Sequence, residues 1–112
     1  MRKALFVFLL MVTASCGEQG RCAAAHERVG AVYEGLGAVA MALKHFSSAA
    51  SEEPSVNRWL TSAEAAARAG SAVSTKLALD RARREGELSP EQRRRIEDIE
   101  SSMMVRVSKP TN

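Results

Sequence analysis

The sequence is poor in the residues that build large cores and rigid loops. Aromatic residues make up 4% of its 112 residues, and it contains three prolines and two cysteines. So few aromatic side chains limit the apolar area of a core, because an alanine buries only about one methyl group, worth roughly 0.8 kcal/mol. Two cysteines exclude the dense disulfide framework of many small secreted domains. We therefore expect a thin helical body stabilised by an oligomer, a partner or a membrane.

The sequence also lacks an apolar run long enough to cross a membrane as a helix, which needs about 20 residues. The uncharged apolar run Ala4–Val12 is much shorter than this. The basic residues Arg2 and Lys3 precede the run, and small residues follow it. A basic start, a short apolar run and small residues are typical of a secretory signal. We assign residues 1–15 to a signal peptide.

The residues that close this signal, Thr13-Ala14-Ser15-Cys16, resemble the lipobox of bacterial lipoproteins. The resemblance implies a lipoprotein that is cleaved before Cys16, carries a diacylglyceryl group on the Cys16 thiol, and is acylated (as with palmitate) on its new amino terminus. Residues 16–21 would be the lipidated cysteine and a short tether. The protein would be exported and held at the cell membrane or outer membrane, facing the periplasm or exterior.

The second cysteine keeps an alternative open. If Cys16 is lipidated, Cys22 is an odd thiol in an oxidising compartment. If the signal is instead an ordinary secretory one, Cys16 and Cys22 can close a small disulfide loop. The product would then be a soluble secreted or periplasmic helical adaptor.

The charge balance argues against nucleic acid as a partner. The whole chain carries a formal net charge of +3, but Arg2 and Lys3 leave with the signal, so the body has 14 basic and 13 acidic residues. A nearly neutral exported body does not fit nucleic-acid binding. Opposite charges four residues apart, such as Arg94 and Asp98, predict a solvated helix face.

Apolar residues in the body recur at alternating spacings of four and three. This heptad pattern predicts one helix over residues 22–47 and another over 55–85, packed together with knobs in holes. Residues 47–54 are the predicted connection. The first seam comprises Ala25, Val29, Val32, Leu36, Val39, Leu43 and Phe46.

A third, shorter helix is predicted over residues 90–105. Ser89 and Gln92 form a capping-box pattern at its start, with Pro90 in the first helical position. The expected fold class is all-α: a two-helix antiparallel hairpin with a coiled-coil-like seam plus this short helix, within residues 22–107. Residues 108–112 are predicted to be a disordered tail.

Nothing in the sequence predicts an enzyme, a cofactor or a metal site. No nucleophile elbow or phosphate loop is present. His26 and His45 lie on one predicted helix, about 28 Å apart, and so cannot share a metal ion. Trp59, the single tryptophan, is either a plug at the turn end of the hairpin or an exposed contact for a partner.

These observations together suggest a small membrane-anchored lipoprotein that acts as a non-catalytic binding or structural module of the cell envelope. Its partners would be the membrane and either a second copy or an envelope protein. The soluble adaptor is one alternative. A phage- or plasmid-encoded envelope lipoprotein, acting in lysis or exclusion, is another.

Overall fold

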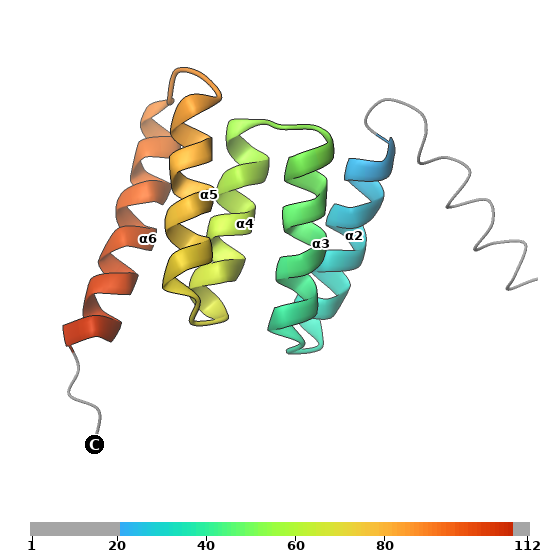
Figure 1. Cartoon of the computed structure of the whole chain (residues 1–112), viewed down its shortest axis with the longest axis horizontal. Helices are drawn as coiled ribbons and strands as arrows, with labels where there is room; N and C mark the ends of the chain where they lie inside the picture. Colours follow the sequence, from blue (N-terminus) through green and yellow to red (C-terminus); the bar gives the residue numbers. More distant parts are fainter. Residues whose placement is uncertain (1–20, 109–112) are drawn as a thin grey trace, which may run out of the picture.

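The computed structural model describes residues 21–108, and these fold into short helices without strands (Figure 1). The signal peptide, most of the tether and all of the predicted tail except Ser108 lie outside the described residues. Ser108 is helical, so the third helix extends beyond its predicted end at residue 105. The all-α class is confirmed, but both long helices are wrong, because each is divided into two. The helices are α2 (Arg21–Gly35), α3 (Val39–Glu52), α4 (Val56–Arg68), α5 (Ala72–Arg84) and α6 (Pro90–Ser108).

A left-handed glycine reverses the chain inside each predicted long helix. Gly37 has φ +78° and Gly70 has φ +79°, a conformation that costs other residues about 1–2 kcal/mol. After α2, the Ala38 amide donates to the Tyr33 carbonyl oxygen at 2.9 Å. After α4, the Ser71 amide donates to the Ala66 carbonyl oxygen at 3.0 Å. Both are Schellman turns, which satisfy the last carbonyl groups of a helix.

Serine side chains cap the first turns of α4, α5 and α6. Ser55 and Ser71 accept hydrogen bonds from backbone amides in the first turns of α4 and α5. At α6, the Gln92 amide donates to Ser89 Oγ at 3.1 Å, and the Ser89 amide donates to Gln92 Oε1 at 2.8 Å. The capping box predicted from the sequence is therefore formed.

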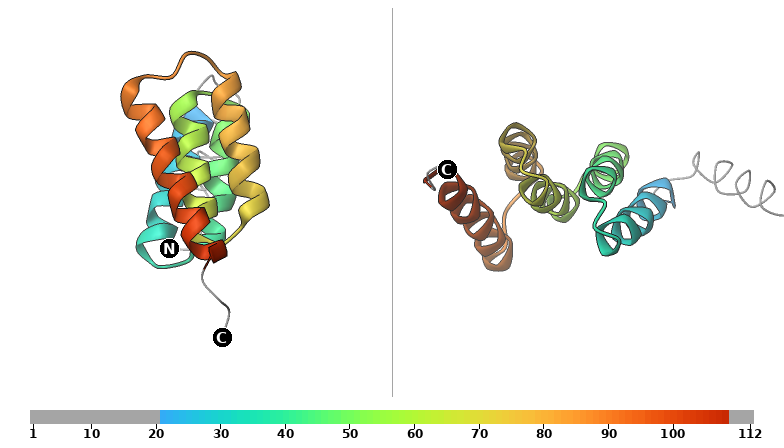
Figure 2. Two further views of the ribbon diagram at one scale, coloured as in Figure 1. Left: turned by 90° about the vertical axis from the view of Figure 1, so that its left-hand side faces the viewer. Right: turned by 90° about the horizontal axis from the view of Figure 1, so that it is seen from below.

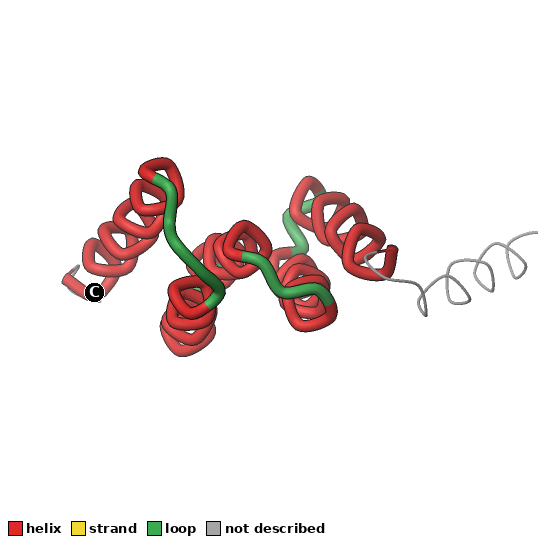
Figure 3. Tube along the Cα trace, turned by 90° about the horizontal axis from the view of Figure 1, so that it is seen from above, coloured by secondary structure: helices red, strands yellow, loops and turns green. Residues whose placement is uncertain are grey.

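The helices form two layers, as seen from either end of the bundle (Figures 2 and 3). One layer holds α2, α4 and α6, which run parallel to one another, and the other holds α3 and α5. α2 packs on α3, α3 on α4, and α4 on both α5 and α6. The result is a thin slab that measures 52 × 38 × 20 Å.

The slab is built from a repeating unit, which consists of a helix, a tight turn and a second helix. The turn glycines Gly37 and Gly70 mark equivalent points of successive units. Buried positions recur at the interval that separates these two glycines, although the residue types differ. The pairs are Ala42 and Thr75, Phe46 and Leu79, and Ala49 and Ala82. Buried Ile96 of α6 follows buried Ala63 of α4 at the same interval, so α6 corresponds to the first helix of a third unit.

The heptad seam predicted across the first long helix is buried at Phe46 of α3, but its residues on α2 and in the turn after it are not the buried face. Val29, Val32 and Leu36 are exposed, while Ala23 and Gly30 are buried. The seam assumed one continuous helix, and the turn at Gly37 brings a different face of α2 against α3. Small residues on that face allow close approach: a Cβ on Gly30 would lie 2.9 Å from the Phe46 ring.

Candidate functional site

Acidic and basic side chains join the three helices of one layer. Arg58 Nε of α4 donates to Glu27 Oε1 of α2 at 3.0 Å. Further along the same two helices, Arg68 pairs with Glu34. Arg95 of α6 donates to both carboxylate oxygens of Glu64, its Nε at 3.3 Å. Three acids and three arginines thus alternate across α2, α4 and α6.

Neutral polar groups extend this arrangement at the start of α4 and α6. Gln92 Nε2 donates to Asn57 Oδ1 at 3.0 Å, and Arg95 reaches the same oxygen at 3.5 Å. Four polar residues of α4 recur at spacings of four, three and four, which places them in one line. They are Asn57, Thr61, Glu64 and Arg68. We call this surface the ionic face; it comprises Glu27, Glu34, Asn57, Arg58, Thr61, Glu64, Arg68, Gln92 and Arg95.

The ionic face is suited to recognition. Its ion pairs are partly open to solvent, with side chains of Arg68 and Glu34 that are 48% and 37% exposed. Such exposed pairs contribute only about 0–1 kcal/mol to stability, so a ligand can exchange bonds with them at small cost. Alternating donors and acceptors match the peptide groups and mixed charges of another protein chain better than a surface of one sign.

A histidine cluster joins α2 to α3. His26 Nδ1 lies 3.0 Å from His45 Nδ1, and the Tyr33 ring stacks on the His45 ring at 5.5 Å between centroids. The wide separation of the two histidines expected along one straight helix is wrong, because the turn at Gly37 folds α3 back along α2. Burial lowers the pKa of His45 below its ordinary value of 6.5, and the nearby His26 and Lys44 lower the pKa further.

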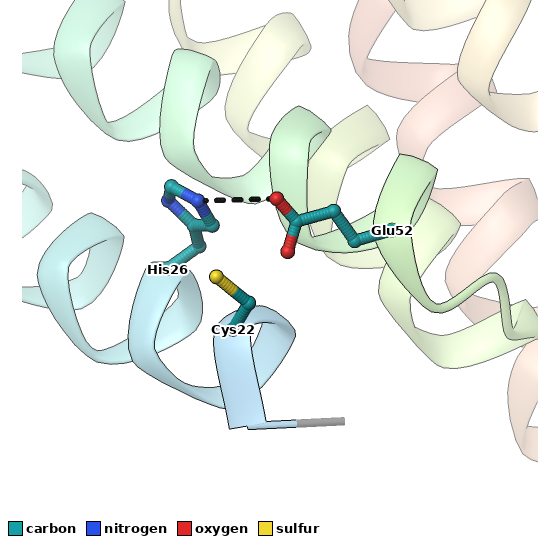
Figure 4. A group of neighbouring side chains, drawn as sticks. All are labelled: Cys22, His26 and Glu52. Atoms are coloured by element: carbon teal, nitrogen blue, oxygen red, sulfur yellow. Dashed lines mark ion pairs between the residues drawn. The ribbon is translucent and has the colours of Figure 1, made fainter. Parts of the chain in front are cut away.

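Cys22, His26 and Glu52 also lie close together (Figure 4). One potential ligand atom of each lies within 4.8 Å of the others, and His26 Nε2 is 3.5 Å from Glu52 Oε1. Cys22, however, is disulfide-bonded. A disulfide sulfur is not the thiolate that binds zinc, and His26 and Glu52 alone do not supply the four ligands of a structural zinc site. The group therefore does not fit a structural zinc ion.

The sequence singles out Cys16 as the lipidation site and Trp59 as a plug or a partner contact. Cys16 lies outside the described residues. Trp59 is buried in the core formed by α3, α4, α5 and α6, with 6% of its surface exposed. The Arg81 guanidinium covers its ring at 5.1 Å, and its indole Nε1 is buried without a hydrogen-bond partner among the described residues.

The ionic face could not be seen in the linear sequence. Its pairs join residues more than 30 positions apart, such as Glu64 and Arg95, and such contacts follow only from the folded-back topology. Outside the ionic face, Arg83 of α5 pairs with Glu100 of α6. The signals in the sequence that could have indicated the folded-back arrangement are the repeat-type residues, among them Gly30, Tyr33 and Phe46.

No protein-family model, curated protein or solved structure matches this chain. Among the described residues, no helix has the length and apolar character needed to cross a membrane.

Proposed function

We propose that this protein is a non-catalytic helical-repeat module of the cell envelope that binds a segment of another envelope protein on its ionic face. The first candidate for its attachment is the lipid on Cys16 that the sequence predicts. The observation that carries the proposal is the row of alternating charges across α2, α4 and α6. Repeat arrays use such extended surfaces, made of equivalent helices, to bind other proteins.

The units are of the tetratricopeptide kind, in which two helices and their turns occupy about 34 residues. That repeat has the pattern W-x2-L-G-x2-Y, then A-x3-F, then P. The first unit carries Val29-Gly30-x2-Tyr33, Ala42-x3-Phe46 and Pro54 in this order. The second unit supplies the tryptophan of the pattern as Trp59. The residues that match the tetratricopeptide pattern and the buried positions that recur between the units therefore support the same kind of repeat.

A charge exchange between Glu64 and Arg95 tests the binding role separately from stability. The double variant Glu64→Arg, Arg95→Glu keeps an ion pair between α4 and α6 but reverses the pattern that a partner meets. A photocrosslinking residue at Thr61, between Asn57 and Glu64 on α4, reports on the partner in intact cells. Lys44 on α3, in the other layer, is the control position.

We expect a defined crosslinked product at Thr61, none at Lys44, and loss of the product in the charge-exchanged variant with little change in melting temperature. A purely structural ion pair would tolerate the exchange. Equal products at both positions, or a product that survives the exchange, would contradict the proposal.

A second candidate function is the soluble adaptor. The disulfide bond of Cys22 favours it, because Cys16 is the only other cysteine in the chain and a lipidated thiol cannot form a disulfide. Mass spectrometry of the mature protein separates the candidates. A lipid-modified amino-terminal Cys16 supports the anchor, and a Cys16–Cys22 disulfide in an unmodified chain supports the soluble form.

A further inference from the structure

Both ends of the helix array present apolar side chains to solvent. The outermost helices are α2 at one end and α6 at the other (Figure 1). At the first end Val32 and Leu36 are 63% and 75% exposed, and at the second end Val73 and Met104 are 82% and 73% exposed. Terminal repeats that remain in water normally carry a polar outer face. Exposed apolar residues at both ends therefore indicate contact surfaces.

The first of these surfaces is a ridge. Val29, Val32 and Leu36 follow one another at spacings of three and four, so they form a line along α2 and the turn after it. Arg28 lies beside this line and is also exposed. We call these three apolar residues the α2 ridge.

The second surface is a groove with a volume of about 440 Å³ between α5 and α6. Lys76, Asp80, Arg83 and Glu100 stand along it, and Arg83 lies 3.7 Å from Asp80 and 3.0 Å from Glu100. Two acids and two bases balance, so the groove has no formal net charge. The α5–α6 groove is lined by apolar Ala72, Val73, Leu79, Met103 and Met104.

The repeat explains why the groove suits a helix. α5 and α6 occupy the positions of α3 and α4 one unit further along the array. The place beside α3 and α4 is filled by α5, whose Ala78 and Leu79 share a core cluster with Ala50 and Trp59. The α5–α6 groove is the corresponding place in the next unit, and it ends the array with an incomplete third unit.

We propose that the α2 ridge of one copy docks in the α5–α6 groove of a second copy, so that the protein assembles head to tail. A second copy is the fitting occupant because each chain carries both halves of the contact, an apolar ridge and an apolar groove with balanced charge, at opposite ends. Ridge and groove are different surfaces, so the contact is heterologous and continues into rings or fibres. This self-assembly is independent of the ionic face.

Two single variants block one half of the contact each. Val32→Glu places a charge on the ridge and leaves the groove intact, whereas Val73→Glu charges the groove and leaves the ridge intact. Both positions are exposed, so neither change disturbs the core. Met41→Glu is the matched control, because Met41 is an exposed apolar residue on α3 outside both surfaces. The readout is mass by light scattering of the full chain in detergent at increasing concentration.

We expect the wild type and Met41→Glu to grow beyond a dimer with concentration, and each of the other variants to remain monomeric alone. A mixture of Val32→Glu and Val73→Glu has one intact ridge and one intact groove, so it should form a dimer and stop there. A monomeric wild type would overturn the proposal. So would a Val32→Glu variant that still dimerises, which would show that two grooves meet, or a mixture that remains monomeric.

Discussion

At the scale of single residues, the absence of a side chain at Gly30 decides how closely α2 approaches α3. The Phe46 ring of α3 occupies the space that a Cβ would need, at 2.9 Å. Phe46 shares its buried core cluster with the small residues Ala42 and Ala65. In this cluster a large aromatic side chain is packed closely because its neighbours are small.

We predict that Gly30→Ala destabilises the protein by about 1–3 kcal/mol, because the added methyl group overpacks the contact with Phe46. Gly35→Ala is the matched control, since a Cβ there meets nothing within 4 Å and alanine favours a helix by up to about 1 kcal/mol. Denaturant unfolding followed by circular dichroism measures both. Equal effects of the two substitutions would show that α2 and α3 are not in close contact at Gly30.

The histidine pair makes stability depend on pH. The contact between the two Nδ1 atoms needs one imidazole as donor and the other, unprotonated, as acceptor. Burial, His26 and Lys44 lower the pKa of His45, so the unfolded chain binds a proton at higher pH than the folded one. Stability should therefore fall as pH falls through about 6.5, and level off below the folded-state pKa.

Melting temperatures between about pH 7.5 and 5.5 test this dependence. The neighbours of His45 on α2 are His26 and Tyr33, and Lys44 precedes it on α3. His45→Gln removes the titrating group, and the variant should lose less stability than the wild type over this range. A steeper or equal loss in His45→Gln would contradict the assignment.

At the scale of helices, the turns at Gly37 and Gly70 determine the topology. The sequence predicted the start of α6 correctly, because a capping box is local and has a distinctive spacing. It did not predict the two turns, because apolar residues continue at heptad spacing through each glycine and mimic one long helix. A glycine in a turn differs from a glycine inside a helix by its left-handed backbone conformation. The pattern of apolar residues does not record this conformation.

We predict that Gly70→Ala lowers stability by about 1–2 kcal/mol, the cost of a left-handed conformation for an alanine. Ala69→Gly is the control. Ala69 has an ordinary φ of −75°, so a glycine there costs at most about 1 kcal/mol. Thermal unfolding of both variants gives the comparison. If Gly70→Ala is instead stabilising, residues 55–85 form one continuous helix.

At the scale of the whole molecule, the two turns convert a predicted hairpin into an array. Helical periodicity correctly predicted an all-α fold. The ionic face and the contact of His26 with His45 could not be predicted, because they depend on which helices become neighbours. The same folding leaves Val32 of α2 and Leu36 of the following turn, both expected to be core residues, exposed to solvent.

The incomplete third unit also bears on stability. Stacked repeats are stabilised mainly by their neighbours, and at least three units are usually needed. Two units and α6 alone therefore leave apolar surface at both ends, which agrees with the expectation that a second copy or a partner contributes to stability. Assembly would raise the apparent melting temperature with protein concentration.

The ionic face, the ridge and the groove exist only if the chain turns back within each predicted long helix. The most direct test is a nuclear Overhauser effect between the Phe46 ring protons and the Gly30 α-protons in the folded protein. The array predicts a strong cross peak, because these groups are in contact. A continuous helix would hold them about 24 Å apart, so an absent cross peak with uninterrupted helical connectivities from Tyr33 to Val39 would contradict the account.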